Sequence, residues 1–404
     1  MKRRRSRISL DAAVIGMATV TLASPAMPQF YSGSGRAIVR FEYALKLPSP
    51  IDGFTWFPDN KTLLVKSGGI RLINTRDRSI SQPVISETLP SWPRLLVSPD
   101  GVYLAVLATK LRVYSATDWR PLSDWRLIPL LGTEARGRPF AQLPGGGLQF
   151  TSDSRSIWVA CDPRPDKGDT AIAIKMRVPD LQVIDSIQTS ITGASFSRTA
   201  ITSNSSDVIE HAYFYTDKRD PKWPDRRWYR AVVGAINLED KSVTMAPKDL
   251  TPDVGDAFGG HNDAISADHG VYVIDQEGHH AVPTSELDSV QEPRLISYDT
   301  HSLQRIREFG SNEERIGDSP VHWSGHANLV LLKGTDLAIA ARATEDHFGG
   351  FRLWNVRTGE LLQSLPAYGT HFLTLSPDQK RMALMHGPDE VLIYSINTAE
   401  VRRP

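Results

Sequence analysis

Seven short stretches of this chain share one pattern, and this repetition constrains the fold more than any other feature. The clearest copy is GGFRLWNVRTGELLQSLP at residues 349–366. The other six are GIRLINTRDRSISQPV from Gly69, KLRVYSATDWRPLSDW from Lys110, AIKMRVPDLQVIDSI from Ala173, VVGAINLEDKSVTM from Val232, RLISYDTHSLQRIREF from Arg294 and EVLIYSINTAEVRRP from Glu390. Each has a run of alternating polar and apolar residues, a polar turn and a second run, which predicts a β-hairpin.

A second hairpin motif, built around an aspartate turn, precedes most of these copies. The turn aspartates are Asp59, Asp100, Asp153, Asp268, Asp336 and Asp378. A version at residues 194–215 is degenerate. The spacing is 41 residues from Asp59 to Asp100 and 42 from Asp336 to Asp378. Four strands per unit at this period are typical of β-propeller blades.

The sequence therefore predicts an all-β fold: a seven-bladed β-propeller with four-stranded antiparallel blades. A ring must close, because an open one exposes strand edges. The last copy stops at Pro404 with barely an outer strand, and AIVRFEYALKLPSP at residues 37–50 reads as a spare strand. We expect this N-terminal strand to complete the last blade. The alternative is a separate edge strand.

The N-terminus has the order of a signal peptide. Basic MKRRRSRISL is followed by apolar AAVIGMATVTLA and then by the small residues of SPA. We therefore divide the chain into a signal peptide at 1–26, a linker at 27–36 and the propeller at 37–404, and expect a periplasmic or secreted protein. The apolar run is too short to span a bilayer, so we expect no stable membrane span in the mature chain. The alternative is a basic tail followed by a chance apolar stretch.

Composition narrows the function classes. The chain has 404 residues, with 46 basic and 46 acidic side chains, so no net field favours nucleic acid. Cys161 is the only cysteine, which rules out an intrachain disulfide and a CxxC metal site. No HExxH, GK[ST] or GxSxG pattern occurs. We assign no catalytic residue, no metal and no cofactor from these motifs.

Two pieces resemble known propeller repeats. Gly325-His326 together with RLWNVRTGELLQSL resembles a WD40 repeat, with Asn355 where such repeats usually carry Asp. The SPDG and SPDQ turns resemble the wider group of WD40-like and YVTN-like bacterial propellers. The resemblance covers residues 37–404 and implies fold rather than chemistry.

The long insertions point to one working face. In a four-stranded meander with strands A to D, the A–B and C–D turns lie at one end, and the B–C and D–A connections lie at the other. The long segments are predicted B–C loops at 162–170, 216–230, 275–293 and 344–350, and D–A connections at 128–146, 247–263 and 309–322. Because long loops on a rigid scaffold carry binding residues, we expect this face to bind. The alternative is that insertions accumulate there by drift.

One of these insertions has the composition of a protein interface. KWPDRRWYR at 222–230 is rich in Trp, Tyr and Arg, the residue types that dominate interface energies. The partner-binding candidates are Trp223, Arg226, Arg227, Trp228 and Tyr229. The alternative is that Trp228 and Tyr229 begin strand C and face the core, with the arginines in solvent.

Histidines gather in the predicted loops of the same face. Candidates for the mouth of the axial channel are His261, Asp263, His279, His280 and His347. Imidazole and carboxylate can hold a transition metal, but no metal-binding spacing is present, and turn or surface roles are the simpler interpretation.

The leading hypothesis is an exported WD40-like propeller that binds a protein or cell-envelope partner through its long-loop face. The alternative is a propeller enzyme or enzyme subunit, similar to lactonases or to the heavy subunits of periplasmic dehydrogenases, with a site at the channel mouth. A ligand sensor is a third possibility. Neither the partner nor the oligomeric state follows from the sequence.

Overall fold

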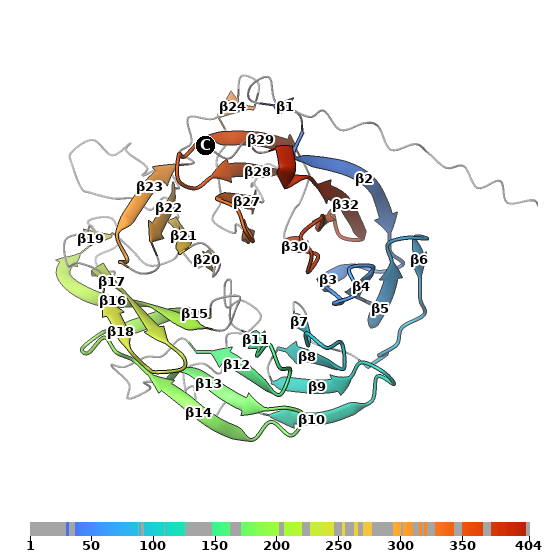
Figure 1. The fold of residues 1–404 in the computed structure, drawn as a ribbon, viewed down its shortest axis with the longest axis horizontal. Coiled ribbons are helices and arrows are strands. Elements are labelled where there is room, and N and C mark those ends of the chain that lie inside the picture. The colour runs from blue at the N-terminus through green and yellow to red at the C-terminus, as the bar shows by residue number, and fades with distance from the viewer. Residues whose placement is uncertain are drawn as a thin grey trace, which may run out of the picture.

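The protein forms a ring of seven four-stranded antiparallel sheets (Figure 1), which confirms the predicted fold class. The computed structural model describes residues 30–31, 37–87, 89, 93–108, 110–125, 148–161, 171–201, 206–219, 227–245, 253–254, 262–265, 270–276, 294–299, 302–309, 315–316, 319–320, 328–342, 350–366 and 373–400. The helical content of these residues is one 3-10 turn, Thr398–Glu400.

The first four blades follow each other along the chain. Blade 1 comprises β3 (Ile51–Trp56), β4 (Thr62–Ser67), β5 (Ile70–Asn74) and β6 (Ser79–Ile80). Blade 2 comprises β7 (Arg94–Val97), β8 (Tyr103–Leu107), β9 (Leu111–Ser115) and β10 (Pro121–Trp125). Blade 3 comprises β11 (Leu148–Phe150), β12 (Ser156–Ala160), β13 (Ala171–Arg177) and β14 (Val183–Gln188). Blade 4 comprises β15 (Phe196–Ile201), β16 (Asp207–Arg219), β17 (Arg227–Asn237) and β18 (Val243–Met245), and β19 (Asp253–Val254) also pairs with β17.

The remaining blades complete the ring. Blade 5 comprises β20 (Asn262–Ile265), β21 (Val271–Gln276), β22 (Arg294–Asp299) and β23 (Arg305–Phe309). Blade 6 comprises β26 (Asn328–Leu332), β27 (Leu337–Arg342), β28 (Gly350–Asn355) and β29 (Leu361–Pro366), with β1 (Phe30–Tyr31) on the outer edge of β29. Blade 7 comprises β30 (Leu373–Leu375), β31 (Arg381–His386), β32 (Glu390–Ile396) and β2 (Val39–Lys46). A small hairpin, β24 (Arg315–Ile316) with β25 (Ser319–Pro320), forms a separate sheet.

The hydrophobic core is divided among the seven contacts between neighbouring blades. Each middle strand is covered on both faces, so its sequence is nearly continuously apolar rather than alternating, as in SIWVA of β12 and RMALMH of β31. Between blades 3 and 4, for example, Trp158 packs in one cluster with Val208 and Ile236. Burying each such side chain stabilises the fold by about 1.5–3 kcal/mol, so every blade depends on both neighbours.

The N-terminal strand closes the ring, as the sequence predicts. β2 pairs antiparallel with β32, from Val39 opposite Ile396 to Lys46 opposite Glu390 (Figure 1). Val39 is fully buried and packs with Leu337, Leu353 and Tyr394 between blades 6 and 7. The outer strand of the last blade therefore comes from the opposite end of the chain.

A buried glutamine fastens this closing strand to the preceding blade. The Oε1 atom of Gln363, on β29, accepts the backbone N–H groups of Ile38 (3.1 Å) and Val39 (2.9 Å). Its Nε2 atom donates to the Val39 carbonyl at 2.6 Å, and the side chain is only 1% exposed. One amide thus satisfies three backbone groups that are shielded from water.

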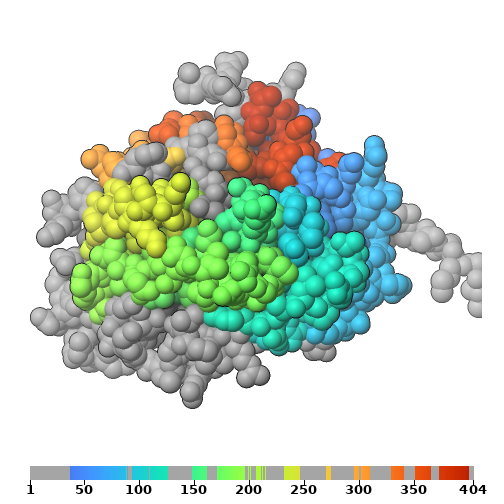
Figure 2. Space-filling model, turned by 60° about the horizontal axis from the view of Figure 1, so that its bottom comes forward, coloured from blue at the N-terminus to red at the C-terminus, as the bar shows by residue number. Residues whose placement is uncertain are grey.

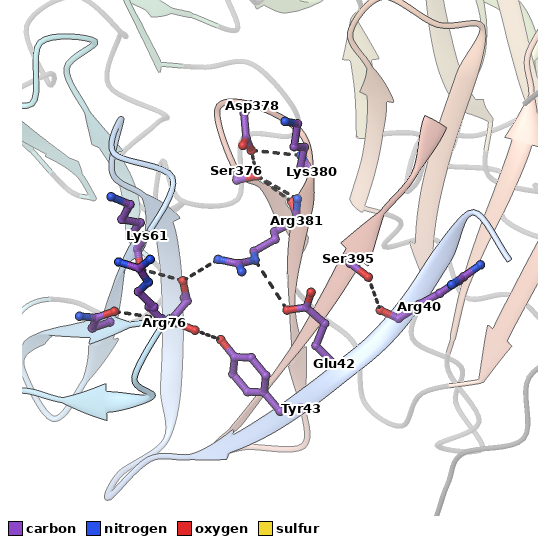
Figure 3. A network of polar contacts seen from close by, with 12 residues as sticks. Arg40, Glu42, Tyr43, Lys61, Arg76, Ser376, Asp378, Lys380, Arg381 and Ser395 are labelled. Atoms are coloured by element: carbon purple, nitrogen blue, oxygen red, sulfur yellow. Dashed lines mark hydrogen bonds and ion pairs between the residues drawn. The ribbon is translucent and has the colours of Figure 1, made fainter. Parts of the chain in front are cut away.

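A polar network joins the last blade to the first on the other side of β2 (Figure 3). The Arg381 guanidinium lies between the Glu42 carboxylate (Nε to Oε2, 3.6 Å) and Thr75 (Nη1 to Oγ1, 3.3 Å). The Tyr43 hydroxyl donates to the Thr75 carbonyl at 2.6 Å. Burial raises the pKa of Tyr43, so this donor stays protonated at neutral pH.

Some tight A–B turns are linked to the preceding blade of the ring through a residue with left-handed backbone. Asn60 has φ 57°, and its Oδ1 accepts the N–H of Asp378 in blade 7 at 2.8 Å. Ser154 has φ 60° and accepts the N–H of Asp100 in the same way, at 3.1 Å. Where this position is glycine, as at Gly101, no side chain can make the link. The left-handed conformation is tolerated by Asn and other small polar residues.

The C–D turns of blades 4 and 6 are each capped by an asparagine. Asn355 Oδ1 accepts the N–H groups of Arg357 (3.0 Å) and Thr358 (3.1 Å). Asn237 caps the blade 4 turn with the same pattern, accepting from Glu239 at 2.9 Å. Asn355 therefore stabilises the turn locally. An aspartate could do the same, because the side-chain oxygen of either residue can accept these hydrogen bonds.

Candidate partner-binding face

The long connections all lie at one end of the propeller axis. Each A–B and C–D turn within the chain has four or five residues, and every longer stretch between blade strands follows strand B or strand D. In an antiparallel meander those connections emerge at the same end of the sheet. We call this end the long-loop face. Many of its connecting residues lie outside the described residues, but the strand ends that carry them are placed.

A hairpin of blade 4 extends beyond its neighbours at this face. β16 has 13 residues and β17 has 11, whereas the other blade strands have at most eight. Pairing of β15 with β16 ends at Tyr213, but β16 continues against β17 to the pair Arg219 and Arg227. The six further residues of β16 span about 20 Å in extended conformation. We call residues 214–219 and 227–230 the blade 4 arm.

The arm rests on a small apolar cluster of its own. Ala212 is buried against Ile191 and Ala194, which belong to the connection between β14 and β15, and Phe214 and Val232 pack against this cluster. The root of the arm is therefore held by side-chain packing as well as by the ladder of blade 4.

A buried carboxylate fixes the same connection. Glu210 of β16 is fully buried; it accepts the N–H of Ser190 at 3.1 Å and the Ser190 hydroxyl at 3.2 Å, and also bonds to the Thr189 hydroxyl. A buried polar side chain is tolerated only where it is hydrogen-bonded in this way. Glu210 thus locks residues 189–190 against β16 and sets the position from which the arm projects.

A second polar cluster fixes the connection between blades 1 and 2. The buried Tyr114 hydroxyl donates to Glu87, and Arg112 Nη1 donates to the same carboxylate at 2.7 Å. Burial, together with the bond to Glu87, raises the pKa of Tyr114 to about 12, so the tyrosine remains a donor at neutral pH. This part of the long-loop face is rigid at its base.

The structure places part of the aromatic and arginine-rich insertion in strands. Arg227, Trp228 and Tyr229 begin β17, where Tyr229 pairs with Tyr215 on one side and Val254 of β19 on the other. Trp223 and Arg226 lie outside the described residues. Treating all of 216–230 as a loop was therefore wrong at both ends, because the flanking residues continue the ladder of blade 4.

Of the five residues predicted to lie at the channel mouth, only Asp263 is among the described residues. Asp263 lies on β20, the inner strand of blade 5, opposite Ile274. His261, His279, His280 and His347 lie outside the described residues, so their convergence stays a prediction. In the part of the chain that the structure describes, no three His, Cys, Asp or Glu side chains are grouped to hold a metal ion. The same part has no helix with the length and apolarity to cross a membrane.

The outer strands of blades 3 and 4 carry exposed apolar side chains that the sequence analysis missed. Val183 and Ile184 of β14 and Val243 and Met245 of β18 are each 43–49% exposed. Figure 2 shows the surfaces of blades 3 and 4 adjoining along this wall, and Lys241 Nζ bridges them to Asp185 Oδ1 at 2.9 Å. The signal available in the sequence was the pair of consecutive aliphatic residues Val183 and Ile184 in a short predicted outer strand.

Asp185 also shields the edge of β14. Its Oδ1 accepts the N–H of Ser186 at 2.8 Å, which occupies a backbone donor of the outer strand. Partial burial opposes ionisation, but the Lys241 ammonium and the Ser186 N–H together hold the pKa of Asp185 below its usual range. A charged side chain on an edge strand discourages pairing with another chain.

Comparisons with known proteins show the fold alone. No family model matches the chain, and no curated protein matches it. Among solved structures 1027 chains match, so the architecture is widespread and does not select one function. One is a chain in the crystal structure of a mitotic checkpoint complex, with 12% identity, a TM-score of 0.55 and coverage of 98% of this chain and 99% of that one. The likeness extends over nearly the whole of both chains and shows the fold, but not a family or a role.

Proposed function

We propose that this chain is an exported, WD40-like propeller of the bacterial YVTN-like kind that binds a protein partner of the cell envelope through its long-loop face. The blade 4 arm is the principal contact. The observation that carries the proposal is the extension of β16 and β17 past β15 and β18 at the end of the axis where the long connections gather. A projecting hairpin on a rigid ring offers backbone and side chains to a partner at little entropic cost.

Several properties of the chain support a binding role. The seven inter-blade cores and the closing strand make the ring stiff. The WD40-type propeller is a common platform for protein docking, and the arm contributes Tyr and Arg residues, which are enriched among interface hot spots.

Shortening the arm tests this function. Residues 216–228 are replaced by Asn-Gly, which joins the paired residues Tyr215 and Tyr229 by a two-residue hairpin turn. We expect retention of the envelope partner on the immobilised protein to fall at least about ten-fold, a loss of roughly 1.4 kcal/mol. Thermal stability should change little, since the blade cores are untouched. Proteins retained by the wild-type chain are identified by mass spectrometry.

The matched control lies at the opposite end of the axis. Lys61 and Lys380 are exposed in A–B turns, so the double variant Lys61→Gln and Lys380→Gln should retain the partner fully. Full retention by the shortened-arm variant would contradict the assigned contact, whatever the control does.

Export is supported by the basic, apolar and small-residue order of residues 1–26. If cleavage follows Ala26, N-terminal sequencing of protein from the extracytoplasmic fraction should begin at Met27. Recovery of an uncleaved chain only from the cytoplasm would refute this part of the proposal.

A further inference from the structure

The outermost described pair of the blade 4 arm juxtaposes two like charges. Arg219 of β16 and Arg227 of β17 are direct Cα partners, after an irregularity in β16. Like charges directly opposite each other destabilise an antiparallel pair, whereas opposite charges stabilise it. The backbone pairing thus places two arginines at opposite positions of the ladder.

Another arginine of the same arm has an acidic residue as its Cα partner. Arg230 is opposite Asp253 of β19, which supplies an acidic residue from the chain itself. Among the described strands, no acidic residue is in register with Arg219 or Arg227. The register of the described strands therefore places an acidic residue opposite the arginine at the root of the arm, and an arginine opposite the arginine at its far end.

The local composition strengthens this asymmetry. Residues 214–230 contain six basic and three acidic residues, within a chain whose formal net charge is zero. Excess positive charge is thus concentrated on the hairpin that has the longest strands among the described blades. Arginine is also the residue suited to bidentate recognition of carboxylates.

We propose that the end of the blade 4 arm binds an acidic segment of the protein partner, whose Asp or Glu carboxylates form ion pairs with Arg219 and Arg227. This proposal rests on the proposed function. The partner's carboxylates complement the excess of basic over acidic residues in 214–230. An extended acidic segment can lie along the projecting hairpin, beyond the point where β15 stops pairing with β16.

The test uses the full chain and a fluorescein-labelled oligo-glutamate peptide, followed by fluorescence anisotropy. We expect binding that weakens as salt is raised, because exposed charges are screened. The double variant Arg219→Gln and Arg227→Gln should weaken peptide binding at least about ten-fold, with unchanged or slightly higher thermal stability, since the repulsion is relieved. The Lys61→Gln, Lys380→Gln variant removes the same charge elsewhere and should bind as wild type.

The outcomes separate this inference from the proposed function. Salt-independent peptide binding, equal weakening by both double variants, or no binding to wild type overturns it. If the envelope partner is lost from the shortened-arm variant but retained by Arg219→Gln, Arg227→Gln, the arm is the contact and the acidic occupant is wrong. If neither variant loses the partner, the proposed function fails first. Loss of partner and peptide together supports both.

Discussion

Replacing Gln363 by alanine should destabilise the protein by about 3–5 kcal/mol, although the side chain belongs to neither strand of the closing pair. The substitution leaves the N–H groups of Ile38 and Val39 and the Val39 carbonyl without their partner in a buried place. Each buried, unsatisfied backbone group costs about 1–3 kcal/mol, and water entering the space left by the side chain offsets part of the sum. The measurement is the free energy of unfolding from urea titrations.

Two further variants make this expectation specific. Gln363→Glu keeps the size of the side chain but presents a carboxylate to the Val39 carbonyl, so it should be destabilising at neutral pH. Burial would raise the pKa of this glutamate in the folded state, so stability should recover as the pH falls through that pKa. Gln304 is exposed in a C–D turn, and Gln304→Ala should cost less than about 0.5 kcal/mol. A loss below about 1 kcal/mol for Gln363→Ala would show that β2 does not depend on this amide.

The blades were predictable because their signals are local. Alternation marks the outer strands, continuous apolar runs mark the middle ones, and Asp, Asn and Gly occupy the turns. The closing strand could also be inferred, since the last repeat lacked an outer strand and residues 37–50 had nowhere else to pair. Local chemistry and the need to cover strand edges led to the same architecture.

The contacts between distant residues could not be predicted in this way. Nothing in the sequence near Gln363 distinguishes it from a surface glutamine, because its partners are more than 320 positions away. The link from Asn60 to Asp378 has the same character. Both depend on how the ring closes, which periodicity does not specify.

The strands of the blade 4 arm were not predicted, because their composition is typical of a loop. Asp, Lys, Arg and Pro have low strand propensity, so residues 216–230 resembled a loop, while pairing in blade 4 carries β16 to Arg219 and begins β17 at Arg227. The long-loop face could be identified from connection lengths, but the extended strands of the blade 4 arm could not. Tertiary pairing here outweighed local preference.

Ring closure is tested most directly by a disulfide between its two ends. Arg40 of β2 and Ser395 of β32 are Cα partners, and the Ser395 hydroxyl donates to the Arg40 carbonyl at 3.4 Å (Figure 3). Antiparallel partners lie about 4.5–5.5 Å apart, within the range that a disulfide bridges. Cys161 is buried and does not compete.

We expect the variant with Arg40→Cys and Ser395→Cys to oxidise within one chain. The bridge should give faster migration on a non-reducing gel and raise the free energy of unfolding by up to about 5 kcal/mol, because it closes a very long loop. A control pairing Arg40→Cys with Ser302→Cys, in a turn of blade 5, should remain reduced. If the Arg40 and Ser395 cysteines stay reduced, or join only different molecules, the propeller is not closed by its N-terminal strand.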